Sequence, residues 1–314
     1  MSLKKNSIKT VSIIICTYKR PNHLRQVIRT VKELIIPEGL LAELLIIDNC
    51  PMEEVQRVIA EETVGTKIPF KYVEEARRGI VFARNRALLE AKEQGSDYIA
   101  FIDDDDHPDE QWIVQLWACM GKYSATVVSG KMVFNWPESC TLDEEIRRVY
   151  DGARGNHATG ELLARCGTGN TLIDFEFIRT HNLSFKPLFN LTGGEDSHFF
   201  EAMTVLGGKI VWCNEAIVYS DIIEERANEE YVWRRRYNIG YTDHLRYRLL
   251  YGRSKAFRKS LRLIFRNGTT VLSSYFSTSN NIKVKGKKRM AELRGIFDAM
   301  MGVKYENYAD TDGN

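Results

Sequence analysis

Short apolar runs alternate with longer amphipathic segments along the first half of the chain. The runs occupy residues 11–16, 44–47, 70–73 and 98–102, and isoleucine, leucine, valine and aromatic residues dominate them. Between the first two runs, apolar residues recur at helical spacing over residues 24–34, just after a proline suited to a first helical turn. Strands separated by helices indicate βαβ units. The pattern therefore predicts an α/β fold with a mostly parallel central sheet and flanking helices.

Polar side chains follow three of these four runs. Thr17 and Tyr18 follow the first, Asp48 follows the second, and Asp103–Asp105 follow the fourth. Right-handed crossovers place the carboxyl ends of parallel strands at one edge of a sheet, so we expect these groups to converge. Ligands bind at this edge in open α/β sheets. The sequence therefore predicts a binding site there.

The fourth run leads into four consecutive aspartates, Asp103–Asp106. Adjacent carboxylates repel one another, and each is costly to desolvate. A solvated acidic loop is the simplest interpretation. The alternative is a divalent-cation site, because hard oxygen ligands suit Mg²⁺ or Mn²⁺. The expected convergence of polar strand ends favours the cation.

The pattern becomes more mixed beyond about residue 125. Residues 127–130 and 169–173 predict further strands, and residues 197–206 predict a helix. The sequence Gly-Gly-Glu-Asp at residues 193–196 precedes that helix. The positive end of the helix dipole would favour either acid, Glu195 or Asp196.

Composition indicates a globular intracellular protein. Of 314 residues, 44% are hydrophobic and 27% are charged, which are ordinary values for a folded chain. Six scattered cysteines without a C-x-x-C pair favour reduced thiols over disulfides or a zinc site. The chain begins without a signal-peptide pattern, and no apolar run approaches the roughly 18 residues that span a bilayer. We therefore expect a cytoplasmic location.

The last third of the chain is strongly basic. Residues 246–290 contain thirteen lysines and arginines and no acidic residue, with apolar side chains interspersed. This segment predicts a basic helical extension, either solvated and packed on the core or attracted to anionic lipid head groups. The second interpretation would make the protein peripheral on the inner face of the membrane. No nucleic-acid-binding module is recognisable, so nucleic acid is not an expected partner.

Several familiar phosphate and metal motifs are missing. The sequence contains no G-x-x-x-x-G-K-[ST] loop and no G-x-G-x-x-G after the first strand. An EF-hand beginning at Asp103 would need glycine and glutamate where Pro108 and Val114 stand. Nucleotide-diphosphate chemistry is the remaining candidate. It needs a carboxylate-held cation, a general base and positive side chains, and Arg234–Arg236 are candidates for the last.

Seven short segments resemble motifs of the family 2 glycosyltransferases, which have the nucleotide-sugar-binding GT-A fold. The resemblance covers about residues 10–245, and it is closest to enzymes of the succinoglycan-biosynthesis type that build surface polysaccharides. It implies a glycosyltransferase domain over residues 1–245 and a basic helical extension over residues 246–314. The nucleotide-binding half would be about 10–125 and the acceptor half about 126–245. The segments, in chain order, are SIIICTYKRP, LLIIDNC, GIVFARNRAL, FIDDDD, GTGN, GGEDSHFF and ERANEEYVWRRRYNIG.

The resemblance implies roles for individual residues on the donor side. Thr17, Tyr18 and Asp48 are expected to line the base pocket, with Asp48 accepting from the uracil imide of a UDP-sugar. Asp103 and Asp104 are expected to approach the ribose and sugar. Asp105 is the expected ligand of Mg²⁺ or Mn²⁺. Arg84 is expected to support the donor site, although a structural helix salt bridge is an equal alternative.

On the acceptor side, the resemblance implies that Asp196 is the general base of an inverting transfer. Glu195 and Asn170 are expected on the same side of the site. The pattern demands no role for Asp106. Asp221 stands where some relatives supply a histidine ligand, and it is either a metal ligand or a surface acid.

The function implied is metal-dependent, inverting transfer of a sugar from a nucleotide-diphosphate sugar, expected to be UDP-linked, to a glycan or lipid-linked acceptor. The segment around Arg234–Arg236 lacks the Q-x-x-R-W of processive synthases, so distributive transfer in polysaccharide biosynthesis is expected. Two alternatives are a metal-dependent nucleotidyltransferase and a non-catalytic nucleotide-sugar-binding module. The acidic pair at residues 195–196 argues against the first alternative.

Overall fold

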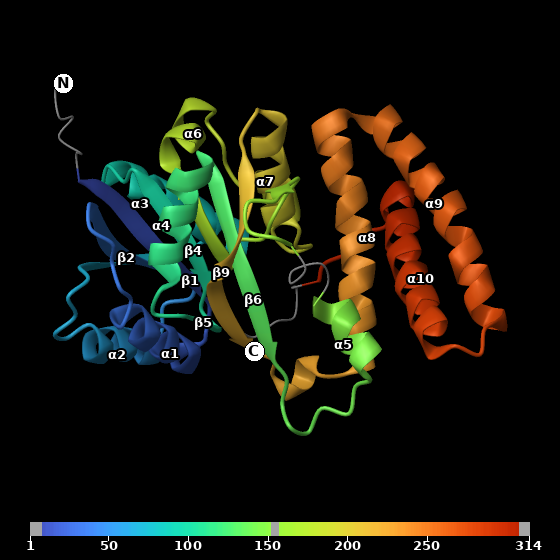
Figure 1. Ribbon diagram of the computed structural model, residues 1–314, viewed down its shortest axis with the longest axis horizontal. Helices are drawn as coiled ribbons and strands as arrows, with labels where there is room; N and C mark the ends of the chain where they lie inside the picture. Colours follow the sequence, from blue (N-terminus) through green and yellow to red (C-terminus); the bar gives the residue numbers. More distant parts are fainter. Residues whose placement is uncertain (1–7, 152–156, 308–314) are drawn as a thin grey trace.

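A nine-stranded sheet forms the centre of the computed structural model, which describes residues 8–151 and 157–307 (Figure 1). The order across the sheet is β3-β2-β1-β4-β8-β6-β9-β5, and β7 also pairs with β9. This α/β architecture confirms the fold class expected from the alternating pattern.

The first four strands are parallel to one another and align their carboxyl ends. Thr17 lies opposite Asp48, and Cys16 lies opposite Asp103. The expected convergence of polar strand ends is therefore confirmed. These strands are β1 (Lys9–Thr17), β2 (Leu40–Asp48), β3 (Phe70–Glu74) and β4 (Tyr98–Asp103).

The second half of the sheet is mixed, so the expectation of a mostly parallel sheet holds in the nucleotide-binding half. β8 enters between β4 and β6 and runs antiparallel to both. β5 and β7 are antiparallel to β9, whereas β6 and β9 are parallel. The bounds are β5 (Asp106–Pro108), β6 (Val127–Asn135), β7 (Leu162–Leu163), β8 (Asn170–Asp174) and β9 (Ile210–Asp221).

Helices bury both faces of the sheet, which explains why its inner strands are continuously apolar. In β1, Ile13 and Ile15 point to one face and Ile14 points to the other. The first face is covered by α1 (Pro21–Lys32), α2 (Glu53–Glu62) and α4 (Trp112–Tyr123). The second is covered by α3 (Ile80–Glu93), α6 (Phe175–Thr180) and α7 (Glu195–Val205).

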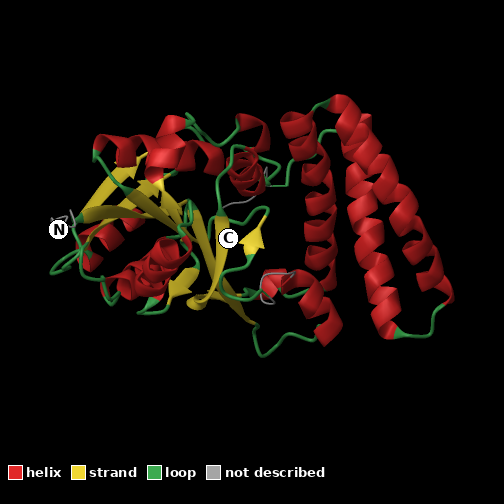
Figure 2. Ribbon diagram, turned by 45° about the horizontal axis from the view of Figure 1, so that its top comes forward, coloured by secondary structure: helices red, strands yellow, loops and turns green. Residues whose placement is uncertain are grey.

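Three long helices form a separate layer beside the sheet (Figures 1 and 2). They are α8 (Glu229–Tyr251), α9 (Arg253–Phe276) and α10 (Asn280–Met301), and the shorter α5 (Glu144–Asp151) packs against α8 and α10. Gly240 and Gly295 allow α8 and α10 to approach closely, because a Cβ at either position would collide with the backbone of the other helix. The expected extension is helical, and residue 245 lies inside α8. We therefore propose that this unit begins at Glu229.

No helix within residues 8–151 and 157–307 combines the length and apolar character needed to cross a membrane. Six cysteines, including Cys16 near the strand ends, carry free thiols. Two 3₁₀ helices, Pro187–Phe189 and Glu224–Arg226, lie in the connections that lead to α7 and α8.

Candidate active site

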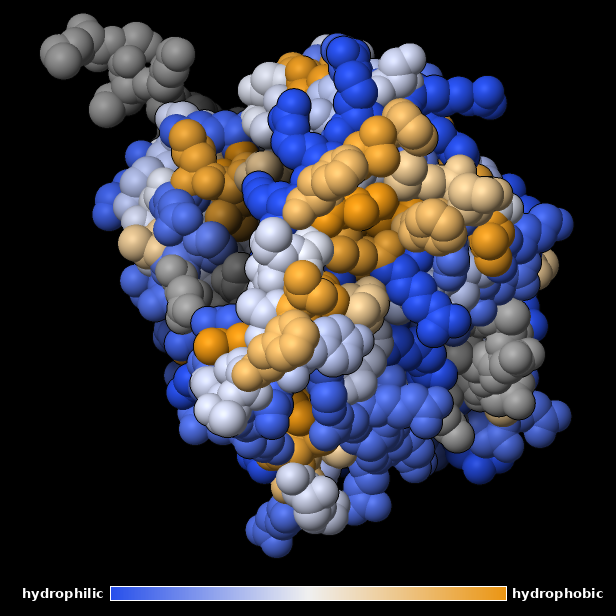
Figure 3. Space-filling model, turned by 90° about the vertical axis from the view of Figure 1, so that its right-hand side faces the viewer, coloured by the Kyte–Doolittle hydropathy of each residue, from blue (hydrophilic) through white to orange (hydrophobic). Residues whose placement is uncertain are grey.

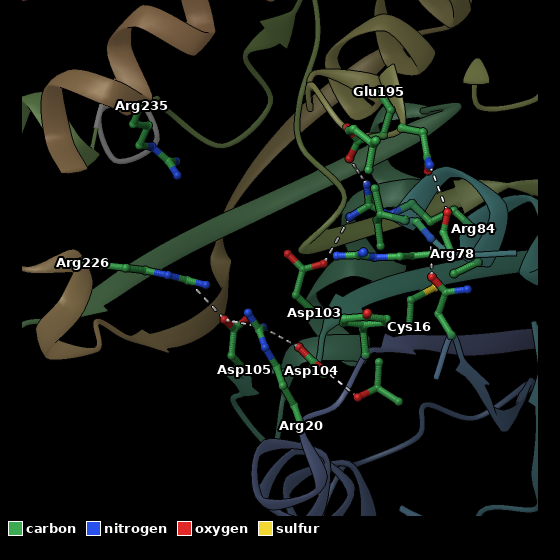
Figure 4. A pocket seen from close by; sticks show the side chains of 18 of the residues that line it. Cys16, Arg20, Arg78, Arg84, Asp103, Asp104, Asp105, Glu195, Arg226 and Arg235 are labelled. Carbon is green, nitrogen blue, oxygen red and sulfur yellow. Dashed lines mark hydrogen bonds and ion pairs between the residues drawn. The ribbon is translucent and has the colours of Figure 1, made fainter. Parts of the chain in front are cut away.

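A cavity of about 340 Å³ lies where the first strand and the fourth strand end (Figure 4). We call it the donor cavity. Side chains from β1, β4, α3, α7 and the segment before α8 converge on it, although they are far apart in the sequence. Residues that line it include Thr17, Tyr18, Arg20, Arg78, Arg84, Asp103, Asp104, Asp105, Glu195, Arg226 and Arg235.

Asp104 points into the protein. Its carboxylate accepts a hydrogen bond of 2.8 Å from the Thr17 hydroxyl and one of 3.0 Å from Arg20. Burial raises the pKa of Asp104 to about 6, and Arg20 opposes that shift. Two residues expected to contact donor, Thr17 and Asp104, are therefore bonded to each other at the base of the cavity.

Asp105 lies between two arginines. Arg20 donates to its Oδ2 over 3.2 Å, and Arg226 donates to the same oxygen over 3.3 Å (Figure 4). The expected metal ligand is thus neutralised by side chains from α1's N-terminal flank and from the 3₁₀ helix before α8.

Arg84 joins the end of β4 to the start of α7. Its guanidinium is buried, donates to Glu195, and lies 3.4 Å from Asp103. Burial raises the pKa of Glu195 above its ordinary value, although the Arg84 cation acts in the opposite direction. Burial also disfavours the Arg84 cation, but Glu195 and Asp103 outweigh it, so its pKa is raised. Arg84 therefore forms a structural salt bridge and also lines the donor cavity.

A second cavity, of about 410 Å³, adjoins the first and contains Asp196 in its lining. We call it the acceptor cavity. Arg84, Asp103, Glu195 and Arg235 line both cavities, so the two are continuous around these four side chains. The Asp196 carboxylate accepts from the Ser197 backbone N–H in the first turn of α7. The two acids therefore differ: Glu195 lines both cavities and is paired with Arg84, whereas Asp196 lines the acceptor cavity only.

Asn170 also lines the acceptor cavity, but its side-chain amide is engaged by the scaffold. It accepts from the Trp112 indole over 2.8 Å and donates to the carbonyls of Lys131 and Ala216. These bonds tie β8 to β6, β9 and α4. Asn170 therefore forms part of the wall of this cavity and holds the strands together.

Asp48 is completely buried, and Asn49 rather than Asp48 lines the donor cavity. Its carboxylate accepts from the Tyr72 hydroxyl over 2.8 Å and from the Cys50 backbone N–H over 2.9 Å. Burial raises its pKa, and these two hydrogen bonds oppose the shift. Tyr72 therefore covers the carboxylate that sequence reasoning places in the base pocket.

Residues 12–180 match the family described as glycosyl transferase family 2, which is more than half of the chain. The chain belongs to glycosyltransferase family 2. It is a glycosyltransferase, as its sequence motifs indicate. Over 243 residues it is 26% identical to the succinoglycan biosynthesis protein ExoM of Rhizobium meliloti (strain 1021), covering 76% of this chain and 75% of that protein.

Solved structures share the fold of this family 2 glycosyltransferase. The S. aureus TarS 1–349 complex with UDP-GlcNAc matches with a TM-score of 0.54 and 14% identity, over 93% of this chain and 91% of that one. The mannosyltransferase PcManGT of Pyrobaculum calidifontis, in complex with GDP-Man and Mn²⁺, matches with a TM-score of 0.62 and 11% identity over 94% and 88%. These likenesses establish the GT-A fold.

The carboxylates of this family 2 enzyme could hold a cation whose coordination is completed by oxygens of the nucleotide-sugar. Asp103, Asp104 and Asp105 all line the donor cavity, but the Asp104 side chain is nearly buried and hydrogen-bonded to Thr17 and Arg20, which leaves Asp103 and Asp105 as the more exposed pair. Within the described ranges, no three histidine, cysteine or acidic side chains converge as a ready-made metal site. The protein would therefore offer two carboxylates, and the remaining ligands would come from diphosphate and water. Asp221 lies outside this lining and pairs with Asn135 and His107.

Sequence reasoning missed most of the arginines in the site. Arg20, Arg78 and Arg226 line the donor cavity, and none was singled out beforehand. Of Arg234–Arg236, only Arg235 reaches it: Arg234 packs against the Tyr231 ring, and Arg236 pairs with Glu292 at 3.0 Å. The Lys-Arg-Pro sequence at residues 19–21 was the available signal for Arg20, because it directly follows a strand end.

Proposed function

We propose that this glycosyltransferase moves a sugar, with inversion, from a UDP-sugar to a glycan or lipid-linked acceptor during surface-polysaccharide synthesis. Its relative in Rhizobium meliloti is a succinoglycan biosynthesis protein, which supports the biosynthetic role. TarS, which shares the fold, is known in complex with UDP-GlcNAc and with UDP, which supports a UDP-linked donor.

The observation that carries this proposal is the Arg84 link between the two cavities. Arg84 contacts Asp103 on the donor side and Glu195 on the acceptor side, and the cavities meet around these groups. A donor diphosphate in the first cavity and an acceptor hydroxyl in the second would therefore be neighbours. Such an arrangement supports direct transfer rather than nucleotide binding alone.

Metal dependence is supported by the carboxylates that line the donor cavity. Asp105 would hold Mg²⁺ or Mn²⁺, with Asp103 beside it, and PcManGT provides a precedent for Mn²⁺ in the fold. When bound, the cation would neutralise charge on the departing diphosphate. Arg20 and Arg226, which pair with Asp105, are close enough to share that task.

Asp196 is the proposed general base. An acceptor hydroxyl is a weak nucleophile unless a base removes its proton as the bond to the sugar forms. Glu195 is committed to Arg84, whereas Asp196 faces the acceptor cavity. Inversion follows if Asp196 and the diphosphate lie on opposite sides of the transferred sugar.

The helical layer supports a location at an anionic membrane surface. Phe265, Leu272 and Phe276 lie on one stripe of α9 and are more than 60% exposed. Figure 3 shows apolar side chains gathered on this side of the molecule and bordered by hydrophilic ones. We call these three residues the apolar ridge. Arg258 and Arg262 lie next to it, and basic side chains beside exposed apolar ones suit an anionic lipid interface.

The proposal is tested by thermal shift with a panel of UDP-, GDP- and other nucleotide-linked sugars, with and without Mn²⁺, followed by donor hydrolysis without acceptor. We expect stabilisation by UDP-sugars that depends on Mn²⁺, and slow hydrolysis of the stabilising donor. Nucleotide-sugar binding without hydrolysis or transfer would instead support a non-catalytic binding module.

A further inference from the structure

A third cavity lies among α8, α9 and α10, and we propose that it binds the phosphate or diphosphate group that links the acceptor glycan to its lipid. This inference rests on the proposed function, because it names the chemistry of the acceptor. The cavity is about 450 Å³. We call it the helical cavity.

The helical cavity has a strong excess of positive charge. Its lining contains six basic residues and two acidic ones. The acids are Asp243 and Glu292; the basic residues are Arg165, Arg235, Arg236, Lys259, Arg266 and Arg289. Six cations around one cavity repel one another, so a bound polyanion would relieve an electrostatic cost that two carboxylates offset only in part.

The two acids are already shared among several cations. Glu292 pairs with Arg236 at 3.0 Å and with Arg289 at 2.8 Å. Asp243 pairs with Arg246 at 2.6 Å and lies 3.7 Å from Arg165. Within the described residues, Arg235, Lys259 and Arg266 have no carboxylate at ion-pair distance. Three of the six cations could therefore pair with a bound anion without losing an existing ion pair.

Partial burial makes these cations more receptive to an anion. Arg236 is only 8% exposed, and its buried Nε has no hydrogen-bond partner among the described residues. The Arg235 Nε is likewise buried and without such a partner. Burial lowers the pKa of Lys259, whose ammonium lies over the Tyr247 ring, and an anion nearby would stabilise that ammonium. Charge-assisted hydrogen bonds to phosphate oxygens would satisfy these donors.

The position of the helical cavity relates it to transfer. Arg165 and Arg235 line both the helical cavity and the acceptor cavity, and Arg235 also lines the donor cavity. A glycan whose free end lies beside Asp196 could therefore continue past these two arginines to a diphosphate among the helices. The apolar ridge belongs to α9, which also supplies Lys259 and Arg266. A lipid attached to that diphosphate would leave the protein beside a surface suited to membrane.

Calorimetric titration with inorganic diphosphate, geranyl diphosphate and geraniol tests the inference. The informative variant is Lys259→Gln/Arg266→Gln, which removes two cations from the cavity lining. Arg258→Gln/Arg262→Gln is the matched control, because it removes the same charge from exposed positions of α9 outside that lining. We expect the first variant to weaken geranyl diphosphate binding at least tenfold at low salt and the control to weaken it much less. Geraniol, which has no phosphate, should bind to both double variants with the same affinity.

Three results would overturn the inference or part of it. Equal weakening in both double variants would mean that general surface charge attracts the anion. Unchanged binding in the first variant would remove the helical cavity as a phosphate site. Inorganic diphosphate bound as tightly as geranyl diphosphate would overturn the lipid-linked assignment and indicate a small-anion site. Arg266→Gln alone, at an exposed position, repeats the comparison if the double variant melts early.

Donor hydrolysis separates this inference from the proposed function. Lys259 and Arg266 lie outside the lining of the donor and acceptor cavities, so the double variant should hydrolyse the donor at the wild-type rate. If the wild type itself hydrolyses no nucleotide sugar, the proposed function fails, whatever the diphosphate titrations give. If hydrolysis is intact but the variant binds geranyl diphosphate normally, only the helical-cavity inference fails.

Discussion

Arg84 on α3 and Glu195 at the first turn of α7 form a buried ion pair although 111 residues separate them in the sequence. The same guanidinium reaches Asp103 at the end of β4. A single cation therefore links the carboxylate at the end of β4 to the carboxylate at the start of α7.

Breaking this pair should destabilise the protein. Arg84→Gln leaves the Glu195 carboxylate buried without its cation, and such changes cost about 3–5 kcal/mol in the free energy of unfolding. Arg84→Gln/Glu195→Gln should recover part of that loss, because the uncompensated charge is gone. Urea denaturation measures both, with the exposed Arg148→Gln as a control that should change little. A double variant no more stable than Arg84→Gln would contradict this account.

The acidic pair should separate into two roles. Asp196→Asn keeps the size of the side chain but cannot accept a proton, so transfer should fall by about a hundred- to ten-thousand-fold. Donor affinity should persist, since the donor cavity is lined by other residues. Glu195→Gln should have a milder effect on transfer and a larger one on stability. Calorimetry and transfer assays compare the variants; a near wild-type Asp196→Asn beside an inactive Glu195→Gln would exchange the roles.

Metal binding should depend on competition for Asp105. Asp105→Asn should remove the Mn²⁺-dependent part of nucleotide affinity without unfolding the protein. Arg226→Gln should strengthen Mn²⁺ binding in the absence of nucleotide, because it removes a cation that pairs with the same oxygen. Titration of Mn²⁺ with and without UDP measures both effects. Asp221→Asn is the control, and an equal loss of Mn²⁺ affinity there would make Asp221 a ligand.

Asp104 should make stability depend on pH. Its ordinary pKa is 3.8 and its pKa in the folded protein is about 6, so the folded state retains a proton that the unfolded chain has lost between those values. The protonated Asp104 carboxyl therefore contributes to the free energy of unfolding in full below about pH 4, and this contribution is lost as the pH rises through 6. Asp104→Asn should thus match the wild type near pH 4 and exceed it by up to about 3 kcal/mol at pH 7. A stability difference that does not grow between pH 4 and 7 would contradict the buried, destabilised carboxylate.

The apolar ridge should contribute to membrane binding. Phe265→Ser/Phe276→Ser removes the two most exposed rings of α9 and should weaken binding to vesicles that contain anionic lipid, as measured by co-sedimentation. Wild-type binding should fall steeply as salt rises, since each engaged lysine or arginine contributes about 1 kcal/mol near the surface. Leu188→Ser, on an exposed residue of a 3₁₀ helix, is the control. Equal wild-type binding to neutral vesicles would exclude an electrostatic attachment.

Much of the nucleotide-binding half follows from the sequence alone. Strands over 11–16, 44–47, 70–73 and 98–102 are all present, because continuous apolar runs that must be buried on both faces have few other solutions in a short segment. The meeting of Thr17, Asp48 and Asp103 at one edge also follows, because parallel connections leave carboxyl ends together. The family was likewise recognisable from seven ordered motifs.

The sequence pattern did not determine the directions of the later strands. β8 runs antiparallel between β4 and β6, and the long strand β9 was not anticipated. A five-residue strand has the same side-chain alternation whichever way it enters a sheet, so its direction depends on contacts with distant strands. The helical layer shows the same dependence, since the close approach of α8 and α10 requires that Gly240 and Gly295 have no side chain.

Tertiary structure also decided what each charged side chain does. Asp103, Asp104 and Asp105 are chemically identical neighbours, yet they pair with Arg84, with Thr17 and Arg20, and with Arg20 and Arg226. Thr17 and Arg20 follow the neighbouring strand β1, but Arg84 and Arg226 come from segments that strand periodicity does not place beside β4. The sequence determined which carboxylates reach the rim of the sheet, because strand periodicity is local. Packing determined which carboxylate turns inward and which faces the cavity, because the energy of a charge depends on every group around it.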